Sequence, residues 1–238
     1  MADYPEKPVT VVVPFAAGGP TDKVARDLGD VLRKQLNQPV IVENVGGAGA
    51  TLGAAKVAKA SPDGYTVLLH HIGMATAPAL YRKLPYDTLA DFEFLGMINE
   101  VPMTLVGRST LPAANFAELR KWIEGGKVKA FGVTTIKRLT TPALAKLPTL
   151  DESGLKGFNV SIWHGLYAPK GTPKAVLDKL NTALRAALKD PEFIKREEAL
   201  GAVVVTDGRL SPVEHKKFVE SEIQKWGPVI KAAGQYAD

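Results

Sequence analysis

The chain has 238 residues, of which 45% are hydrophobic and 23% charged, with no cysteine and a net charge of +5. This length and composition predict a folded globular chain of one large α/β domain or two lobes. The absence of cysteine excludes disulfides, a thiol nucleophile and a Cys-ligated zinc site. Charged residues interrupt every apolar run before about 18 residues, so no membrane span is expected. Lys and Arg are spread along the chain, so nucleic acid is not an expected partner.

The amino-terminal end does not look like a leader. Met1 to Pro5 contain no basic segment followed by an apolar stretch. We therefore expect no signal peptide in this sequence. An exported protein is still compatible with it, because a mature domain can be written without its leader.

The first third of the chain alternates strand and helix patterns. Val9 to Val13 is a β-branched run, as in a strand buried on both faces. Thr21 is the expected N-cap of the next helix, and residues 39–45 and 65–70 are expected as further buried strands, with an Ala-rich helix ending near Ala60 between them. The first helix has an apolar stripe of Val24, Leu28, Val31, Leu32 and Leu36. This βαβαβ order predicts a doubly wound half-domain.

The rest of the chain predicts more strands and helices after a Pro-broken stretch at residues 78–91, where a change of lobe is expected. Ser211 to Glu214 form a capping box for the last helix, which is expected to bury Phe218, Trp226 and Ile230. The expected strands are 92–106, 127–134, 160–168 and 202–205, and the expected helices are 115–124, 172–189, 190–201 and 211–234.

Two Gly-rich loops are the main candidates for a binding site. Residues 18–21 follow the first strand and residues 46–51 the second, and each loop precedes a helix. In an open parallel sheet both loops lie at the carboxyl edge, where free N–H groups and helix dipoles favour an anion. The glycines of one loop alone are explained by a tight turn, but the pair favours a ligand. Asn44 stands where a dinucleotide site would have an acidic residue, and neither loop is a P-loop.

The histidines give weaker signals. His70 and His71 end the third strand at the same edge, where one can bind a ligand oxygen while the other packs in the core. His164 fits either a pocket wall or simple packing, and His215 lies on a charged helix where we expect it to be solvated. Adjacent strand residues point to opposite faces, so no metal site is expected. Because no nucleophile elbow is present, nothing in these motifs indicates catalysis.

Several longer runs, taken together, form a specific pattern over nearly the whole chain. They are VPFAAGGPTD at 13–22, VENVGGAGATLG at 42–53, PDGYTVL at 62–68, KAFGVT at 129–134, PTL at 148–150, WHGLYAPKGTP at 163–173 and the tail from Trp226 to Asp238. In order and spacing they resemble the Bug-type solute-binding proteins of tripartite tricarboxylate transporters.

The resemblance implies a periplasmic, non-catalytic protein with an α/β, periplasmic-binding-protein-like (type II) two-lobe fold and mostly parallel sheets. It implies a monomer that needs no cofactor and that delivers a small carboxylate to the membrane permease subunits of the transporter. The ligand carboxylate would be held, partly through water, by main-chain N–H groups of the two Gly-rich loops. The matching positions are Phe15, Ala17, Gly18, Gly19, Thr21, Asp22, Ala48, Gly49 and Thr51, with His70, His71 and Trp163 as the variable pocket wall.

One departure from the family pattern is large. Between Glu124 and Gly125 the family has a further stretch of about half a domain that this chain lacks. The expected organisation is therefore a first lobe from residues 1–100 and 166–238, with residues 101–165 as crossover strands and a remnant of a reduced second lobe.

Three functional hypotheses follow from the sequence. The first is capture of a dicarboxylate or aromatic acid, because Phe15, Trp163 and two histidines offer an aromatic and polar lining. The second is an enzyme that acts on an anionic substrate with His70 or His71 as general base. The third is a one-lobe interaction module that has lost its ligand.

Overall fold

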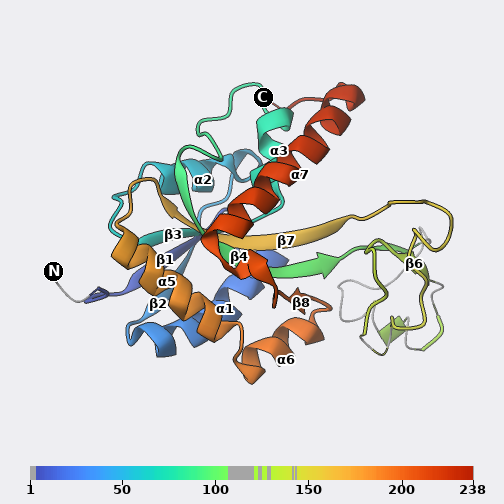
Figure 1. Ribbon diagram of the computed structural model, residues 1–238, viewed down its shortest axis with the longest axis horizontal. Helices are drawn as coiled ribbons and strands as arrows, with labels where there is room; N and C mark the ends of the chain where they lie inside the picture. The colour runs from blue at the N-terminus through green and yellow to red at the C-terminus, as the bar shows by residue number, and fades with distance from the viewer. Residues whose placement is uncertain are drawn as a thin grey trace. The chain divides into compact units, whose positions relative to one another are not determined.

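The computed structural model describes residues 4–106, 121–122, 125–127, 130–140, 142 and 144–237 (Figure 1). The chain divides into two compact units. Unit 1 comprises Met1–Asn99, Trp163–Glu197 and Val204–Asp238, and unit 2 comprises Glu100–Ile162 and Glu198–Val203. The assignment of residues 101–165 to the remnant of a second lobe stays a prediction.

A six-stranded sheet carries most of the hydrophobic core, with strand order β2-β1-β3-β7-β4-β8. Its strands are β1 (Val9–Val13), β2 (Val40–Asn44), β3 (Thr66–His71), β4 (Phe92–Pro102), β7 (Ser161–Pro169) and β8 (Val203–Val204). β1 pairs in parallel with both β2 and β3, which confirms the predicted βαβαβ unit. β7 runs antiparallel to β3, and this pairing connects strands far apart in the sequence.

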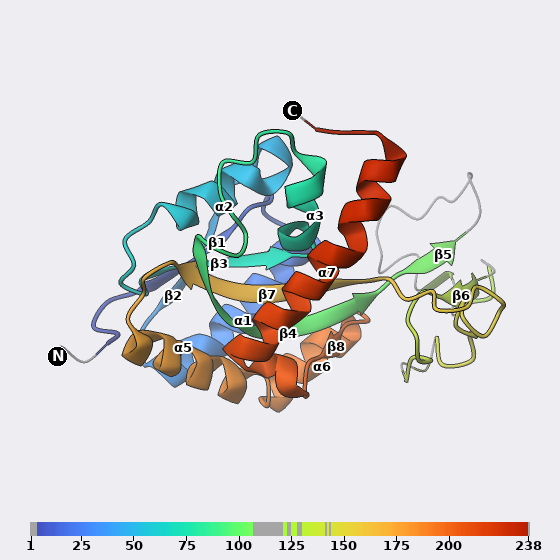
Figure 2. The same cartoon turned by 45° about the horizontal axis from the view of Figure 1, so that its top comes forward.

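Helices cover both faces of this sheet (Figures 1 and 2). The helices are α1 (Pro20–Leu36), α2 (Thr51–Ala58), α3 (Gly73–Leu80), α5 (Lys174–Ala187), α6 (Pro191–Ala199) and α7 (Pro212–Ala233). α1 and α5 pack on one face, and α2, α3 and α7 lie on the other. The predicted apolar stripe of α1, from Val24 to Leu36, is buried. No helix in the described ranges is long and apolar enough to cross a membrane.

Two predictions for the first half of the sheet were wrong. α1 begins at Pro20 with Gly19 as N-cap, so Thr21 lies inside the helix and its hydroxyl contacts His164 instead of capping. β2 is not buried on both faces, because it is the last strand of the sheet and the Ile41 side chain is 50% exposed. A continuous β-branched run fits an edge strand as well as a central one.

The expected face of the last helix was also wrong. The Ser211 hydroxyl accepts a hydrogen bond from the Glu214 amide, as the capping box predicts. However, α7 buries His215, Val219 and Glu222, while the predicted residues Phe218, Trp226 and Ile230 are only half-buried. His215 is therefore a core residue, not a solvated one.

Unit 2 contains a two-stranded antiparallel sheet of β5 (Thr104–Val106) and β6 (Ala130–Val133). The Thr134 hydroxyl lies 2.8 Å from the Met103 carbonyl oxygen and 2.6 Å from the Val160 carbonyl oxygen, so it joins three segments of this unit. The predicted helix at 115–124 falls almost entirely outside the described residues.

Candidate functional site

The two Gly-rich loops lie side by side, because they follow neighbouring parallel strands. β1 ends at Val13 and β2 at Asn44, and these two residues are partners in the register. A Cβ atom built on Gly46 would lie 3.7 Å from the Ala16 amide nitrogen of the first loop. The Asn44 amide Nδ2 also donates to the Phe15 carbonyl oxygen at 3.1 Å. The structure thus brings the predicted loop residues together.

Both loops open helices whose first turns have no side-chain cap. α1 follows Gly19 directly, and α2 follows a short 3-10 turn, η1 (Ala48–Ala50), in which Ala48, Gly49 and Ala50 all have positive φ. The first N–H groups of a helix have no carbonyl partner within the helix, and the helix dipole adds partial positive charge there. The two helix starts lie at one sheet edge, although the Ala50 and Thr51 amides at the second start donate to the Gly47 and Ala48 carbonyl oxygens of the turn.

A predicted donor of the first loop, the Gly18 amide, is occupied as well. The Gly18 N–H donates to the Asp22 carboxylate at 2.8 Å. The same carboxylate accepts from Arg26 Nε at 2.9 Å and from Asn44 Nδ2 at 2.9 Å. Burial pushes the pKa of Asp22 upward, but the hydrogen bonds from Arg26, Gly18 and Asn44 outweigh it and hold the pKa at about 2. Asp22 therefore organises the first loop as a carboxylate.

His70 and His71 end β3 beside the first loop, where the His71 ring lies 4.5 Å from the Phe15 ring. His70 Nδ1 accepts from the His71 amide at 2.7 Å, and His71 Nδ1 accepts from the Gly73 amide at 2.8 Å. Burial lowers the pKa of both imidazoles, so each is neutral at neutral pH. Because Nδ1 is an acceptor in both rings, Nε2 carries the proton and acts as a donor.

A chain of buried hydrogen bonds connects the first loop with α6. Thr21 Oγ1 lies 3.1 Å from His164 Nε2, His164 Nδ1 lies 2.7 Å from Asn99 Oδ1, and Asn99 Nδ2 donates to Glu197 Oε2 at 2.5 Å. Since the Asn99 oxygen is an acceptor, His164 Nδ1 carries its proton. His164 Nε2 is then the acceptor and the Thr21 hydroxyl the donor. Each of these three hydrogen bonds is therefore donated in the direction of Glu197.

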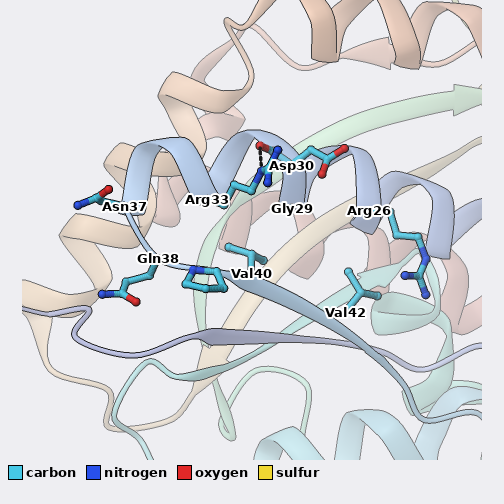
Figure 3. A pocket seen from close by; sticks show the side chains of 9 residues that line it. Arg26, Gly29, Asp30, Arg33, Asn37, Gln38, Val40 and Val42 are labelled. Atoms are coloured by element: carbon cyan, nitrogen blue, oxygen red, sulfur yellow. Dashed lines mark hydrogen bonds between the residues drawn. The ribbon is translucent and has the colours of Figure 1, made fainter.

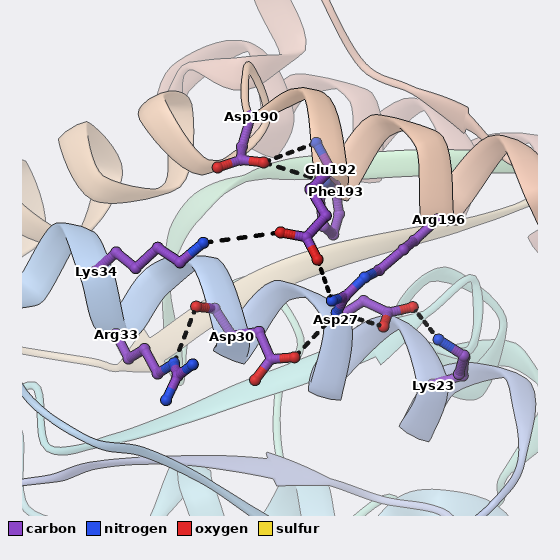
Figure 4. Close-up of polar contacts among 9 residues, drawn as sticks. All are labelled: Lys23, Asp27, Asp30, Arg33, Lys34, Asp190, Glu192, Phe193 and Arg196. Atoms are coloured by element: carbon purple, nitrogen blue, oxygen red, sulfur yellow. Dashed lines mark hydrogen bonds and ion pairs between the residues drawn. The ribbon is translucent and has the colours of Figure 1, made fainter.

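The last group in this series of hydrogen bonds is the Glu197 carboxyl group, and burial disfavours its ionisation. Burial raises the pKa of Glu197 to about 7, against a smaller opposing effect of the Asn99 hydrogen bond. Ion pairs between α1 and α6 hold this end in place (Figure 4). Arg196 of α6 pairs with two acidic residues of α1, Asp30 at 2.9 Å and Asp27 at 3.4 Å. The helix that carries Thr21 therefore also positions Glu197.

Two further predicted site residues, Trp163 and Thr51, make other contacts. Trp163 is 1% exposed, donates to Glu222 at 3.1 Å and packs against Phe218, so its contacts are with α7. The Thr51 hydroxyl donates to the Ala48 carbonyl oxygen at 2.8 Å and closes the second loop.

Two residues near the loops, Tyr81 and Asn99, were not predicted from the sequence. Tyr81 covers the second loop, because a Cβ atom on Gly49 would overlap the Tyr81 hydroxyl. Asn99 connects His164 with Glu197. Neither residue stands in a motif, so only the packing of distant segments reveals them.

The chemistry of this region differs from that of a metal centre or an open surface cavity. Among the described residues, no group of three or more His, Asp or Glu side chains is arranged to hold a metal ion. A depression of about 670 Å³ lies elsewhere, along α1 and β2 (Figure 3). The loop region instead offers backbone N–H donors, two imidazole donors and one aromatic ring, a combination that can bind an anion with an apolar body.

Comparison with solved structures places this fold in the class of periplasmic solute-binding proteins, confirming the predicted α/β binding-protein fold with a reduced second lobe. The periplasmic binding protein BugD is 39% identical, covers 98% of this chain and 99% of its own, and superposes with a TM-score of 0.84. MatC from Rhodopseudomonas palustris, solved with bound malate, is 32% identical with a TM-score of 0.82 and covers 95% of this chain and 100% of its own.

The chain belongs to the tripartite tricarboxylate transporter receptor family, whose model matches residues 24–124 and 116–235. It is thus a solute-binding protein of the Bug type, as the sequence runs indicated. A UPF0065 protein from Agrobacterium vitis, encoded in the TAR-I ttuE-ttuC' intergenic region, is 38% identical over 98% of this chain and 86% of its own length.

The comparisons also confirm the missing segment. The alignment with the Agrobacterium vitis protein runs over 299 positions, whereas this chain has 238 residues. The relative therefore has several tens of residues with no counterpart here. The family model matches in two segments that overlap at residues 116–124, next to the predicted break between Glu124 and Gly125.

Proposed function

We propose that this protein captures a small carboxylate, a dicarboxylate or an aromatic acid, in the periplasm and delivers it to the membrane permease subunits of the transporter. The observation that carries the proposal is the pair of uncapped helix starts at α1 and α2, adjacent at one sheet edge. Free N–H groups and aligned helix dipoles at such ends stabilise negative charge without a lysine or arginine.

The side chains around the loops support the same ligand chemistry. The protonated Nε2 atom of His71 is a second type of donor for a carboxylate oxygen, and the neighbouring Phe15 ring offers an apolar contact. MatC, which shares this fold at 32% identity, was solved with the dicarboxylate malate. We propose the residues of the two loops together with His70 and His71 as the ligand site.

The alternative of a general base at His70 or His71 finds no support in the hydrogen bonds. A base needs an unoccupied ring nitrogen facing its substrate, and Nδ1 of each ring is used by a backbone amide. Incubation with candidate acids followed by NMR of the recovered acid tests this directly. A solute-binding protein returns the acid unchanged, whereas turnover would support the enzyme hypothesis.

The experiment that tests the ligand site is calorimetry with malate, adipate and benzoate on the wild type and two glycine variants. Gly18 has a φ of +83°, and a Cβ atom built on it would have nothing within 4 Å, so the side chain of Gly18→Val would extend into the space over the loop. Gly171→Val is the matched control, because Gly171 has a φ of +85° but lies far along the chain from both loops. We expect Gly18→Val to weaken binding more than tenfold, or about 1.4 kcal/mol.

An equal loss in both variants would indicate a general backbone effect and contradict the loop site.

The missing segment adds a prediction about affinity. A two-lobe binder buries most of its ligand, so a chain with a reduced second lobe leaves more of the acid in water. We expect affinity near the millimolar range, and complete absence of binding to all three acids would favour the interaction module that has lost its ligand.

A further inference from the structure

The outer edge of β2 has main-chain groups that face no other strand. Val9 N donates to the Pro39 carbonyl oxygen and Val45 N donates to the Val13 carbonyl oxygen, so the odd-numbered residues of this segment face β1. Because strand residues alternate, the N–H and C=O groups of Val40, Val42 and Asn44 point to the opposite side. β2 is the last strand of the sheet order, so that side is an open edge.

One stripe of α1 overhangs this open edge and makes it a groove. Arg26, Gly29 and Arg33 lie on the helix face toward β2, and a Cβ atom on Gly29 would be 3.5 Å from the Val40 side chain. Figure 3 shows Val40 and Val42 pointing from β2 toward this stripe. The depression between them has a volume of about 670 Å³, enough for a short extended peptide segment.

The groove has a positive wall and an apolar underside. Its one acidic side chain, Asp30, is paired with Arg196 at 2.9 Å. Arg26 is paired with Asp22 at 2.9 Å. Arg33 donates through Nε to the Asp30 carbonyl oxygen and has no ion pair with a described residue, so it supplies most of the positive charge of the wall. On the opposite face of the same strand, the Ile41 side chain is 50% exposed. A strand added here would meet arginines on one face and an isoleucine on the other.

We propose that the open edge of β2 and the arginine stripe of α1 form a docking groove that takes an extended acidic segment of a partner protein as an additional strand. Strand addition satisfies the open main-chain groups of Val40 and Val42, and pockets or charges beside the edge select the side chains. A second copy of this chain fits less well, because two β2 edges pairing with each other would bring their arginine stripes together.

The geometry also predicts the sequence pattern of the partner segment. Side chains of a strand alternate between the two faces of the sheet. Acidic residues at every second position would lie on the face that carries Arg33, and apolar residues between them would cover Ile41. The expected pattern is therefore acidic and β-branched residues in alternation.

The test uses a blocked seven-residue peptide of alternating Glu and Val, titrated into the full chain and followed by two-dimensional NMR. Three control peptides separate the parts of the proposal. A peptide with Lys for Glu removes charge complementarity, one of the same composition with the Val residues clustered removes the alternation, and one N-methylated on the edge that faces β2 removes the ladder. We expect binding of the first peptide only, weakening as salt screens the charges.

Two variants test the site itself. Val42→Pro removes an N–H that points away from β1, a position where edge strands tolerate proline, so the chain should still fold. Arg33→Glu reverses the charge of the wall at an exposed position. We expect Val42→Pro to abolish peptide binding and Arg33→Glu to weaken it about tenfold or more, while the melting temperature and carboxylate binding of Arg33→Glu stay at the wild-type values.

Several results would overturn the proposal. Equal binding of the Glu and Lys peptides would remove the role of the arginines, and unchanged binding in Val42→Pro that melts normally would remove the role of the edge. If the Glu–Val peptide failed to bind at low salt, the groove would not be a docking site for an acidic strand. A wild-type chain that sediments as a dimer and becomes monomeric in Val42→Pro would assign the edge to a second copy.

Discussion

The two Gly-rich loops follow neighbouring strands and both begin helices, yet their glycines have different reasons to be glycine. At Gly18 the backbone has a φ of +83° and the space around a Cβ position is empty. At Gly53, which follows the second loop, a Cβ atom would lie 2.6 Å from the Val45 carbonyl oxygen and 2.7 Å from the Pro14 side chain. Gly18 in the first loop needs a backbone conformation, whereas Gly53, in the first turn of α2, needs close packing. Gly49 in the second loop needs both, because its φ is +59° and Tyr81 lies over it.

The loops also differ in charge and in what holds them. Asp22 fixes the first loop as a buried carboxylate, and Thr21 connects it through His164 to the interior. The second loop is closed by its own backbone and Thr51, with Tyr81 lying over Gly49. Changes near the first loop should therefore respond to pH, and changes near the second should respond to side-chain volume.

The largest expected effect tests the pH response. Burial raises the pKa of Glu197 to about 7, so the folded chain keeps this proton while the unfolded chain, with a pKa of 4.5, loses it. The wild type should lose stability as pH rises from 4.5 to 7, by about 3 kcal/mol at about 1.4 kcal/mol per pKa unit. Glu197→Gln should lack this loss. Urea denaturation at pH 4 and pH 8 measures both.

Comparing the pH dependence of stability of the wild type with that of Glu197→Gln isolates the contribution of the Glu197 carboxyl group. Burial lowers the pKa of His164 and His215 to about 3, so their contribution to stability is present above pH 6.5 and is lost as the pH falls below that value. Both proteins carry these histidines, and the difference between their pH profiles cancels them. Parallel profiles for wild type and Glu197→Gln would contradict a protonated Glu197.

The next effect tests the packing of the second loop. Helix propensity alone would make Gly53→Ala stabilising by about 1 kcal/mol. The added Cβ would overlap the Val45 backbone oxygen and Pro14, which cannot rotate away, and such overpacking costs about 3 kcal/mol. We expect a net loss of about 2 kcal/mol in chemical denaturation. Gly18→Ala, with free space around it, should lose only about 1 kcal/mol from its positive φ, so the two losses should differ.

Local sequence patterns predicted a helix or strand correctly where the residues of that element alone determine it. The β-branched run at Val9–Val13 and the stripe from Val24 to Leu36 are strong periodic signals, and the structure confirms both. Position within the sheet is a different matter. The edge location of β2 and the antiparallel pairing of β7 depend on distant segments, so no local pattern encodes them.

The candidate site shows the same limit. Its loops could be found from glycines after strands, because that pattern is local. The expected N-cap at Thr21 failed because His164, far along the chain, competes for its hydroxyl. His215 has charged neighbours in sequence, but with Val219 and Glu222 it forms a helical stripe that turns into the core. The charged neighbours of His215 suggested an exposed helix face, whereas the packing of α7 on the core buries this face.

The smallest expected effect tests the connection between the two loops. Asn44, at the end of β2, donates through Nδ2 to the Asp22 carboxylate at 2.9 Å and to the Phe15 carbonyl oxygen at 3.1 Å. Asn44→Ala removes both bonds from a half-buried site, which should cost about 1 kcal/mol in chemical denaturation. The pKa of Asp22 should rise from about 2 toward 3.8, because the carboxylate loses one donor, and a carboxyl NMR titration measures this. Since a lowered pKa stabilises the fold above that range, the loss should be larger at pH 7 than at pH 2. Gln38→Ala, a truncated amide beside the same strand, should leave both quantities unchanged, and a wild-type pKa for Asp22 in Asn44→Ala would show that the two loops are held independently.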